Sequence, residues 1–325
     1  LGHLQKEMAR VRARMAPLEA ELARREAWRF DDRGDQAEHD ELDRLVQAFE
    51  TFAAEVVPDV SGRLETATTI AARSIDDHRD GWDPAAREVR ESEAYGGLEL
   101  VAQVGLIPLG SDPLSGLQEL AHVGSGEILE LFGDGDLAIN DYKSVVILIV
   151  PAVRFRMGAI RPRPPDRPGP NFDPRAQLSE GPIHELTLSA FLLSKYEMTQ
   201  GQWLRLTGSN PSSWPVGREA GGKITTLRHP VEAVTWDRAR QGLHRAGLTL
   251  PTEAQWEFMC RAGTTSAWAM GADKRDLARF GNIGSAECPR SWHEVPGITE
   301  SWLDGYGDLP ADAGSFECNA FGLFD

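Results

Sequence analysis

Apolar residues recur at alternating intervals of three and four over the first 22 residues of this 325-residue chain. This spacing is the a/d repeat of a helix that packs against another helix. The repeat consists of Leu1, Leu4, Met8, Val11, Met15, Leu18 and Leu22. Pro17 lies inside it and lacks the N–H of one helix hydrogen bond, so we expect a kink there. Because a lone helix of this length is marginal in water, the repeat predicts pairing with another helix.

A second amphipathic helix is predicted after a break at Arg33-Gly34-Asp35. Its apolar face would consist of Leu42, Leu45, Val46, Phe49, Phe52 and Val56. The two apolar stripes can pair within one chain as an antiparallel hairpin, or they can join two chains through residues 1–56. We assign residues 1–90 to a helical, coiled-coil-like region, for which the simplest role is that of a tether without chemistry.

Charge and hydropathy narrow the classes of partner. The chain has 34 basic and 50 acidic residues, a formal net charge of −16. Binding to a nucleic-acid backbone requires clustered Lys and Arg, so nucleic acid is not expected as a partner. The longest apolar run, Val145 to Val150, is far shorter than the roughly twenty residues of a membrane span. We expect a piece of a longer protein, without a membrane span or signal peptide, and favour a cytoplasmic location.

Residues 91–151 are predicted to form a small β-rich module. Turn-forming residues interrupt short β-like runs such as 98–104, and the module ends in a buried strand at 145–150. Gly133-Asp134-Gly135-Asp136 resembles a calcium-binding loop, but the other EF-hand positions are absent. A hairpin turn is therefore the preferred interpretation.

Residues 152–325 are predicted to begin with two strands, at 155–158 and 183–196. Eight of the 20 prolines lie between Pro151 and Pro182 and predict an extended loop between these strands.

Two helix starts carry a capping box, a Thr followed three residues later by a Gln. They are Thr199 with Gln202, and Thr252 with Gln255. In the second helix, Trp256 and Cys260 share a face at a spacing of four, so Cys260 is expected to point inward.

Several segments together resemble the formylglycine-generating enzyme family, also called sulfatase-modifying factors. The matching segments are Met157-Gly158, Glu197-Met198-Thr199, His229 to Trp236, Leu250 to Gly263, Trp268 with Gly271, Asn282-Ile283 and Phe321-Gly322-Leu323-Phe324-Asp325. The resemblance covers roughly residues 152–325 and implies an α+β fold, a variant of the C-type-lectin architecture. It also implies oxidation of a peptide cysteine to formylglycine with O₂ and copper.

The resemblance assigns no catalytic residue within this chain. In the family, the paired cysteines that hold copper and the substrate peptide follow a segment that would lie beyond Asp325. Cys260, Cys288 and Cys318 match none of those positions, and we interpret them as free thiols.

The resemblance implies a structural Ca²⁺ site formed by Asn282, Ile283, Asp304 and Tyr306. Ca²⁺ takes six to eight oxygen ligands, which Asn and Asp side chains and the carbonyls of glycine-containing turns can supply. Asp325 would begin a second calcium site. The alternative is that both loops are ordinary Gly-Asp turns. We interpret the histidines at 184 and 229 as structural.

Three functions stay open at this point. The first is an enzyme that acts on a peptide or protein substrate. The second is a non-catalytic sensor with a lectin-like surface, attached to a signalling domain such as a kinase in a bacterial multidomain protein. The third is a coiled-coil tether. One fold carries many activities, so the fold alone does not choose among them.

Overall fold

The chain divides into two compact units, residues 1–70 and residues 71–325. The computed structural model describes residues 10, 13–14, 16–18, 20–21, 33–51, 57–128, 141, 143–161, 169–220, 222–271, 273–284, 286, 302–306 and 309–324. Within these ranges, no helix combines the length and the apolar character that a membrane crossing would need.

The N-terminal unit is helical in its described residues. Those between 10 and 21 are helical, Pro17 among them. Helix α2 (Arg33–Thr51) is followed by α3 (Val57–Ala71). The break expected at residues 33–35 is wrong, because α2 begins at Arg33 and continues through Asp35. Most of the first apolar repeat, as well as Phe52 and Val56, lies outside the described residues, and coiled-coil pairing stays a prediction.

The centre of the second unit is a four-stranded antiparallel sheet in the order β1-β2-β3-β6. Its strands are β1 (Leu106–Ser111), β2 (Gln118–His122), β3 (Val146–Val150) and β6 (Phe191–Ser194). Every residue of β3 is buried, which confirms the buried strand expected at 145–150. Residues 98–104 form no strand. Their alternate apolar residues, Leu98, Leu100 and Ala102, instead pack on the core as irregular chain.

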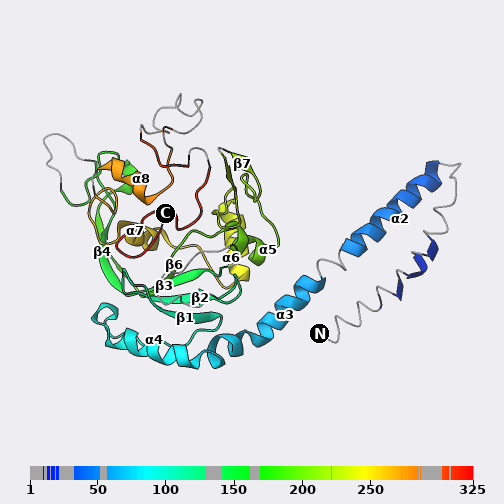
Figure 1. Cartoon of the computed structure of the whole chain (residues 1–325), viewed down its shortest axis with the longest axis horizontal. Coiled ribbons are helices and arrows are strands. Elements are labelled where there is room, and N and C mark those ends of the chain that lie inside the picture. Colours follow the sequence, from blue (N-terminus) through cyan, green and yellow to red (C-terminus); the bar gives the residue numbers. More distant parts are fainter. Residues whose placement is uncertain are drawn as a thin grey trace. The chain divides into compact units, whose positions relative to one another are not determined.

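This sheet runs across the boundary that the sequence predicts at residue 151. Strands β1 and β2 come from the region 91–151, whereas β6 comes from the region 152–325. The helical region predicted for 1–90 likewise extends into the second unit, because α4 (Arg79–Glu91) lies along the outer strand β1 (Figure 1). In the structure, residues 71–151 are therefore part of the same compact unit as residues 152–325.

The other elements complete a mixed α+β fold. Strands β4 (Val153–Met157) and β5 (His184–Leu188) pair antiparallel, which confirms a strand on each side of the proline-rich segment. The single strand expected at 183–196 is wrong in extent, because that segment is divided between β5 and β6, which lie in different sheets. Residues 162–168 of that segment lie outside the described ranges. The remaining elements are η2 (Ala72–Asp76), η3 (Glu93–Tyr95), η4 (Leu178–Glu180), α5 (Gln200–Thr207), β7 (Glu219–Ala220), β8 (Lys223–Ile224), α6 (Trp236–Arg245), α7 (Glu253–Arg261), η5 (Lys274–Asp276) and α8 (Leu277–Phe280).

Both predicted capping boxes are present. Thr199 accepts a hydrogen bond from the backbone N–H of Gln202 at the start of α5, and Thr252 does the same with Gln255 at the start of α7. In each case the Gln side chain bonds the backbone N–H of the Thr in return. These contacts satisfy N–H groups that have no partner inside the helix and so fix where both helices begin.

The hydrophobic core joins α4, the sheet and α7. It includes Trp82 of α4, Leu120 of β2, Leu148 of β3 and Met259 of α7. The buried Tyr95 connects the layers, because its hydroxyl donates to the Ile149 carbonyl at 3.0 Å and accepts the Gln118 N–H at 2.8 Å. The segment that follows α4 is thereby fixed to β2 and β3.

Candidate functional site

Two loops that the sequence singled out meet at one carboxylate. Asp304 accepts the backbone N–H of Ile283 at 3.1 Å through Oδ2 and that of Tyr306 at 3.0 Å through Oδ1. The neighbouring Asn282 donates from Nδ2 to the Leu309 carbonyl at 2.7 Å. The structure thus brings together Asn282, Ile283, Asp304 and Tyr306, whereas Asp325 lies outside the described residues.

A cation from the β7–β8 hairpin lies against the second loop. The Lys223 ammonium donates to the Gly305 carbonyl and lies 3.9 Å from the centre of the Tyr306 ring. Tyr306 in turn packs on Phe316, with 5.3 Å between ring centres. One carbonyl of the loop is therefore paired with a positive charge supplied by the protein itself.

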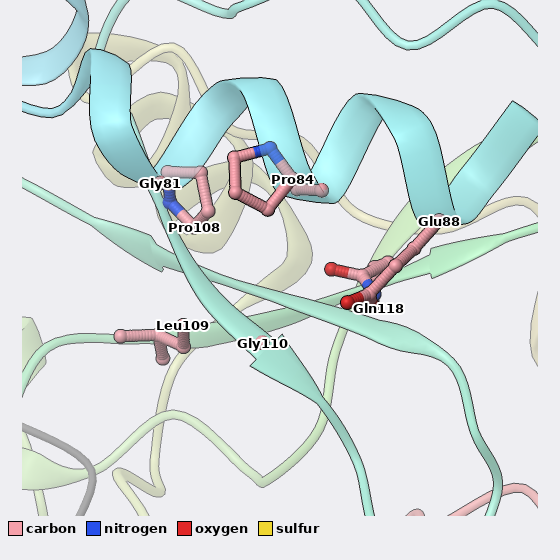
Figure 2. A pocket seen from close by; sticks show the side chains of 8 residues that line it. Gly81, Pro84, Glu88, Pro108, Leu109, Gly110 and Gln118 are labelled. Atoms are coloured by element: carbon pink, nitrogen blue, oxygen red, sulfur yellow. The ribbon is translucent and has the colours of Figure 1, made fainter.

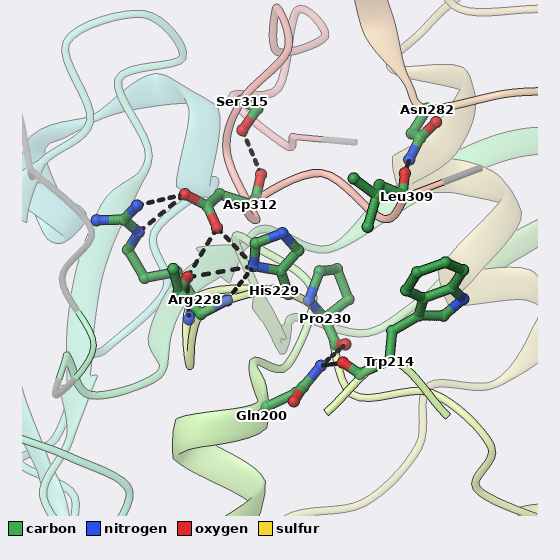
Figure 3. A network of polar contacts seen from close by, with 10 residues as sticks. Gln200, Trp214, Arg228, His229, Pro230, Asn282, Leu309, Asp312 and Ser315 are labelled. Carbon is green, nitrogen blue, oxygen red and sulfur yellow. Dashed lines mark hydrogen bonds and ion pairs between the residues drawn. The ribbon is translucent and has the colours of Figure 1, made fainter. Parts of the chain in front are cut away.

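The chain that follows these loops is held by a polar network around Asp312 (Figure 3). Its Oδ2 accepts from Arg228 Nε at 2.9 Å and from Arg228 Nη2 at 2.6 Å. Its Oδ1 accepts from the Thr226 hydroxyl at 3.0 Å and lies 2.7 Å from His229 Nδ1. The Ala313 N–H adds a bond to the Arg228 carbonyl. Residues 309–315 are thereby fixed to the segment 226–230.

The His229 ring serves this network structurally. Nδ1 accepts the Thr226 N–H at 3.0 Å, and the ring also bonds the Pro310 carbonyl. Burial lowers the pKa of His229, the Asp312 charge opposes this, and the net pKa lies below the ordinary value. Both nitrogens of the imidazole therefore contact protein groups.

The cysteines differ from the expectation in one respect. Cys260 is exposed, so the inward orientation expected for it is wrong. The buried face of α7 is formed by Phe258 and Met259, whereas Trp256, one turn before Cys260, is 61% exposed. Burial raises the pKa of the half-buried Cys318, which keeps this group a neutral thiol at pH 7. Cys288 lies outside the described residues.

A buried charge cluster was missed by sequence reasoning. The Lys195 ammonium lies 2.7 Å from Asp112 Oδ1 and 2.6 Å from Glu119 Oε1, and all three side chains are at most 7% exposed. The Ser115 hydroxyl and N–H also donate to Asp112. The available signal was weak: Glu119 directly precedes the apolar pair Leu120-Ala121 of β2, and a glutamate that is buried with such neighbours needs a partner.

The cluster shifts the pKa of each member. For Asp112, burial raises the pKa, but hydrogen bonds from Lys195 and Ser115 outweigh burial and leave the pKa below its ordinary value. For Glu119, burial dominates over Lys195 and the pKa is raised. For Lys195, burial lowers the pKa, but hydrogen bonds to both carboxylates raise it above the ordinary value. The cluster is therefore an ionised lysine held between two acids.

A family model described as a sulfatase-modifying factor enzyme 1-like domain matches residues 146–325, more than half of the chain. The chain therefore belongs to the sulfatase-modifying factor family. The match begins at β3, so β1, β2 and α4 lie before it.

Known relatives carry the corresponding name. The chain is 32% identical over 130 residues to the formylglycine-generating enzyme of Bos taurus. This match covers 38% of this chain and 30% of the bovine protein. It is 24% identical over 228 residues to the formylglycine-generating enzyme of Mycobacterium tuberculosis, covering 54% of this chain and 69% of that protein. The chain thus matches about a third of the bovine protein's length. A solved structure, PvdO from Pseudomonas aeruginosa, is similar with a TM-score of 0.38 and 22% identity, over 57% of this chain and 69% of that one.

Proposed function

We propose that the chain carries a formylglycine-generating-enzyme-type domain that binds a cysteine-containing peptide and, in the intact protein, oxidises that cysteine to formylglycine. The observation that carries the proposal is the meeting of residues 282–283 and 304–306 at Asp304. These are the positions that the family resemblance assigns to its structural metal, and they lie inside the matched region. The lectin-like variant of the fold is part of the same proposal.

The donor set at these loops fits Ca²⁺. Asn282 and Asp304 would supply side-chain oxygens, and Ile283 and Tyr306 would supply backbone carbonyls, which are the ligand types that Ca²⁺ prefers. Each oxygen of Asp304 accepts one backbone hydrogen bond and has a second lone pair. The same oxygen donors do not suit copper, because copper favours thiolate ligands. The described residues also contain no group of three metal-ligating His, Cys, Asp or Glu side chains.

Calcium is expected to raise the melting temperature of the protein. The ion binds the folded loops and not the unfolded chain, so the stabilisation grows as RT ln(1 + [L]/Kd). Asp304→Ala removes the only carboxylate among the described members of the site and should abolish the rise. Asp237→Ala, an exposed aspartate of α6, is the matched control and should leave the rise unchanged. Thermal melts with and without millimolar Ca²⁺ measure this, and an equal response in both variants would contradict the site.

Oxidation of a peptide is tested on the intact protein. The probes are synthetic peptides with a single cysteine, and the same peptides with serine are the controls. The reaction replaces the Cβ–S bond by a C=O bond and releases sulfide, with O₂ as the oxidant. Because reduction of O₂ to water consumes more electrons than this step releases, a thiol reductant is added with copper. Mass spectrometry is expected to show the aldehyde in the cysteine peptides only.

The result separates the two functional classes. Saturable peptide binding without aldehyde formation would overturn the oxidation and favour the sensor function. If the peptides neither bind nor form an aldehyde, both functions are rejected for the peptides used.

A further inference from the structure

A pocket of about 220 Å³ lies between helix α4 and strand β1 (Figure 2). It is lined by Gly81, Pro84, Ala85, Glu88, Pro108, Leu109, Gly110 and Gln118. All of these residues precede the region 146–325 that the family model matches. The pocket is therefore a feature of this chain's upstream segment and is independent of the proposed function.

Local backbone irregularities form the walls of the pocket. The pairing of β1 with β2 shifts between Pro108 and Gly110, so Leu109 is an extra residue in a β-bulge. Across from it, Pro84 lies inside α4. A Cβ at Gly81 would be 3.8 Å from the Pro108 ring, so the helix and the strand approach closely there. A proline ring cannot rotate into the pocket as a flexible side chain can. Because Pro84 and Pro108 form its walls, the apolar part of the pocket is largely preformed.

The polar end of the pocket presents hydrogen-bond acceptors. Gln118 is only 1% exposed, and its Nε2 donates to Glu88 Oε2 and to Ser111 Oγ, both at 2.5 Å. The other atom of this amide, Oε1, is buried and has no hydrogen-bond partner. A buried acceptor without a partner is rare in folded proteins and calls for a donor. The carboxylate of Glu88 stands beside it in Figure 2.

We propose that this pocket binds the head group of an organic cation, a primary ammonium or a guanidinium on a short alkyl stem. The head would donate to Gln118 Oε1 and pair with the Glu88 carboxylate, while the stem packs on Pro84, Pro108 and Leu109. The two prolines offer no N–H, and Gln118 Nε2 is already engaged, so an anionic ligand would find few donors. A cavity of about 150 Å³ accommodates a benzene molecule, so this pocket accepts one Lys or Arg side chain or a small free amine.

Binding of n-butylammonium to the full chain tests the proposal. Saturable changes are expected in the NMR signals of the Gly81 and Gly110 amides, whereas n-butanol, which has a similar stem without charge, should give none. Glu88→Gln removes the charge from an exposed side chain and should weaken binding about tenfold or more. Glu91→Gln, on the same helix but outside the pocket lining, is the matched control and should bind with unchanged affinity.

A second variant addresses the buried acceptor. Gln118→Met keeps the length of the side chain and removes Oε1, so it should weaken binding as Glu88→Gln does. A capped Gly-Lys-Gly peptide that binds more tightly than n-butylammonium identifies a peptide side chain as the natural source of the cation. Equal or weaker binding of the peptide identifies a free amine. The proposal is overturned if n-butylammonium gives no saturable change, or if Glu88→Gln binds it as well as Glu91→Gln does.

Discussion

Replacing Lys195 with methionine is expected to lower the free energy of unfolding by about 3–5 kcal/mol, because it leaves two carboxylates buried without their cation. Asp112 and Glu119 are 1% and 3% exposed in their side chains, so water cannot replace the lost ammonium without rearrangement of the structure. Phe324 and Tyr196, whose rings lie 5.7 Å from the Lys195 ammonium, would also lose a cation–π contact.

Urea unfolding monitored by tryptophan fluorescence measures the loss. Arg79→Met is the matched control, because it also removes a cation from an ion pair, Arg79 with Asp76, but at a site where both side chains are more than half exposed. That control should cost less than about 1 kcal/mol. Adding Glu119→Gln to the Lys195→Met variant removes one uncompensated charge and should restore part of the stability. Similar losses in the control and in Lys195→Met would contradict the buried-charge explanation.

The pH dependence of the same cluster follows from the directions of its pKa shifts. The raised pKa of Lys195 makes its contribution complete below the ordinary lysine pKa and lost as the pH rises through the folded value. The lowered pKa of Asp112 makes its contribution complete above the ordinary aspartate pKa and lost as the pH falls through the folded value. Glu119, with a raised pKa, partly offsets Asp112 in acid. In Lys195→Met, the alkaline loss assigned to Lys195 should disappear.

Replacing Gly158 with alanine is expected to cost about 3 kcal/mol or more, from positive φ and a steric clash together. Its φ is 95°, which side chains other than glycine rarely adopt. A Cβ at this position would be 2.6 Å from the carbonyl oxygen of Glu180, a backbone atom that cannot turn away. The Gly158 N–H also donates to Glu257 at 2.7 Å and its carbonyl accepts from Asn171 at 2.8 Å, so a shift of the backbone disturbs two further contacts.

The matched control is Gly208→Ala, at the end of α5. Its φ is 74°, but a Cβ there would have no neighbour within 4 Å. This variant therefore reports the cost of positive φ alone, about 1 kcal/mol. Thermal and urea unfolding of both variants isolates the steric contribution as their difference. Equal losses in the two variants would show that Glu180 moves aside without cost.

Local patterns in the sequence were sufficient for the elements that depend on local chemistry. The capping boxes at Thr199 and Thr252 and the strand at 145–150 could be predicted because their causes lie within a few residues. The position of Cys260 could not. Its exposure depends on which face of α7 meets the core, and the spacing from Trp256 gives only that these two residues share a face. A long-range contact, that of Phe258 with Phe155 and Phe321, decides which face is buried.

The candidate sites likewise include features that a sequence pattern could predict and features that depend on distant residues. The family resemblance pointed to the residues that meet at Asp304, although not to the Lys223 contact, which comes from a hairpin about eighty residues away. The pocket at Gln118 and the Lys195 cluster had no local pattern, since each joins residues from separate elements. The boundary predicted at residue 151 follows the end of the apolar run 145–150 and the extent of the family resemblance, and neither of these reports which strands pair.

The shared sheet has a practical consequence for work on this family domain. A fragment that starts where the family match starts, at residue 146, would keep β3 and lose β2, its neighbour on one side. The sequence of β3, Val146-Ile147-Leu148-Ile149-Val150, would then form an unprotected apolar edge, which is the kind of segment that seeds amyloid-like stacking between molecules. The smallest fragment suited to expression therefore starts near Ala71, where the compact unit begins.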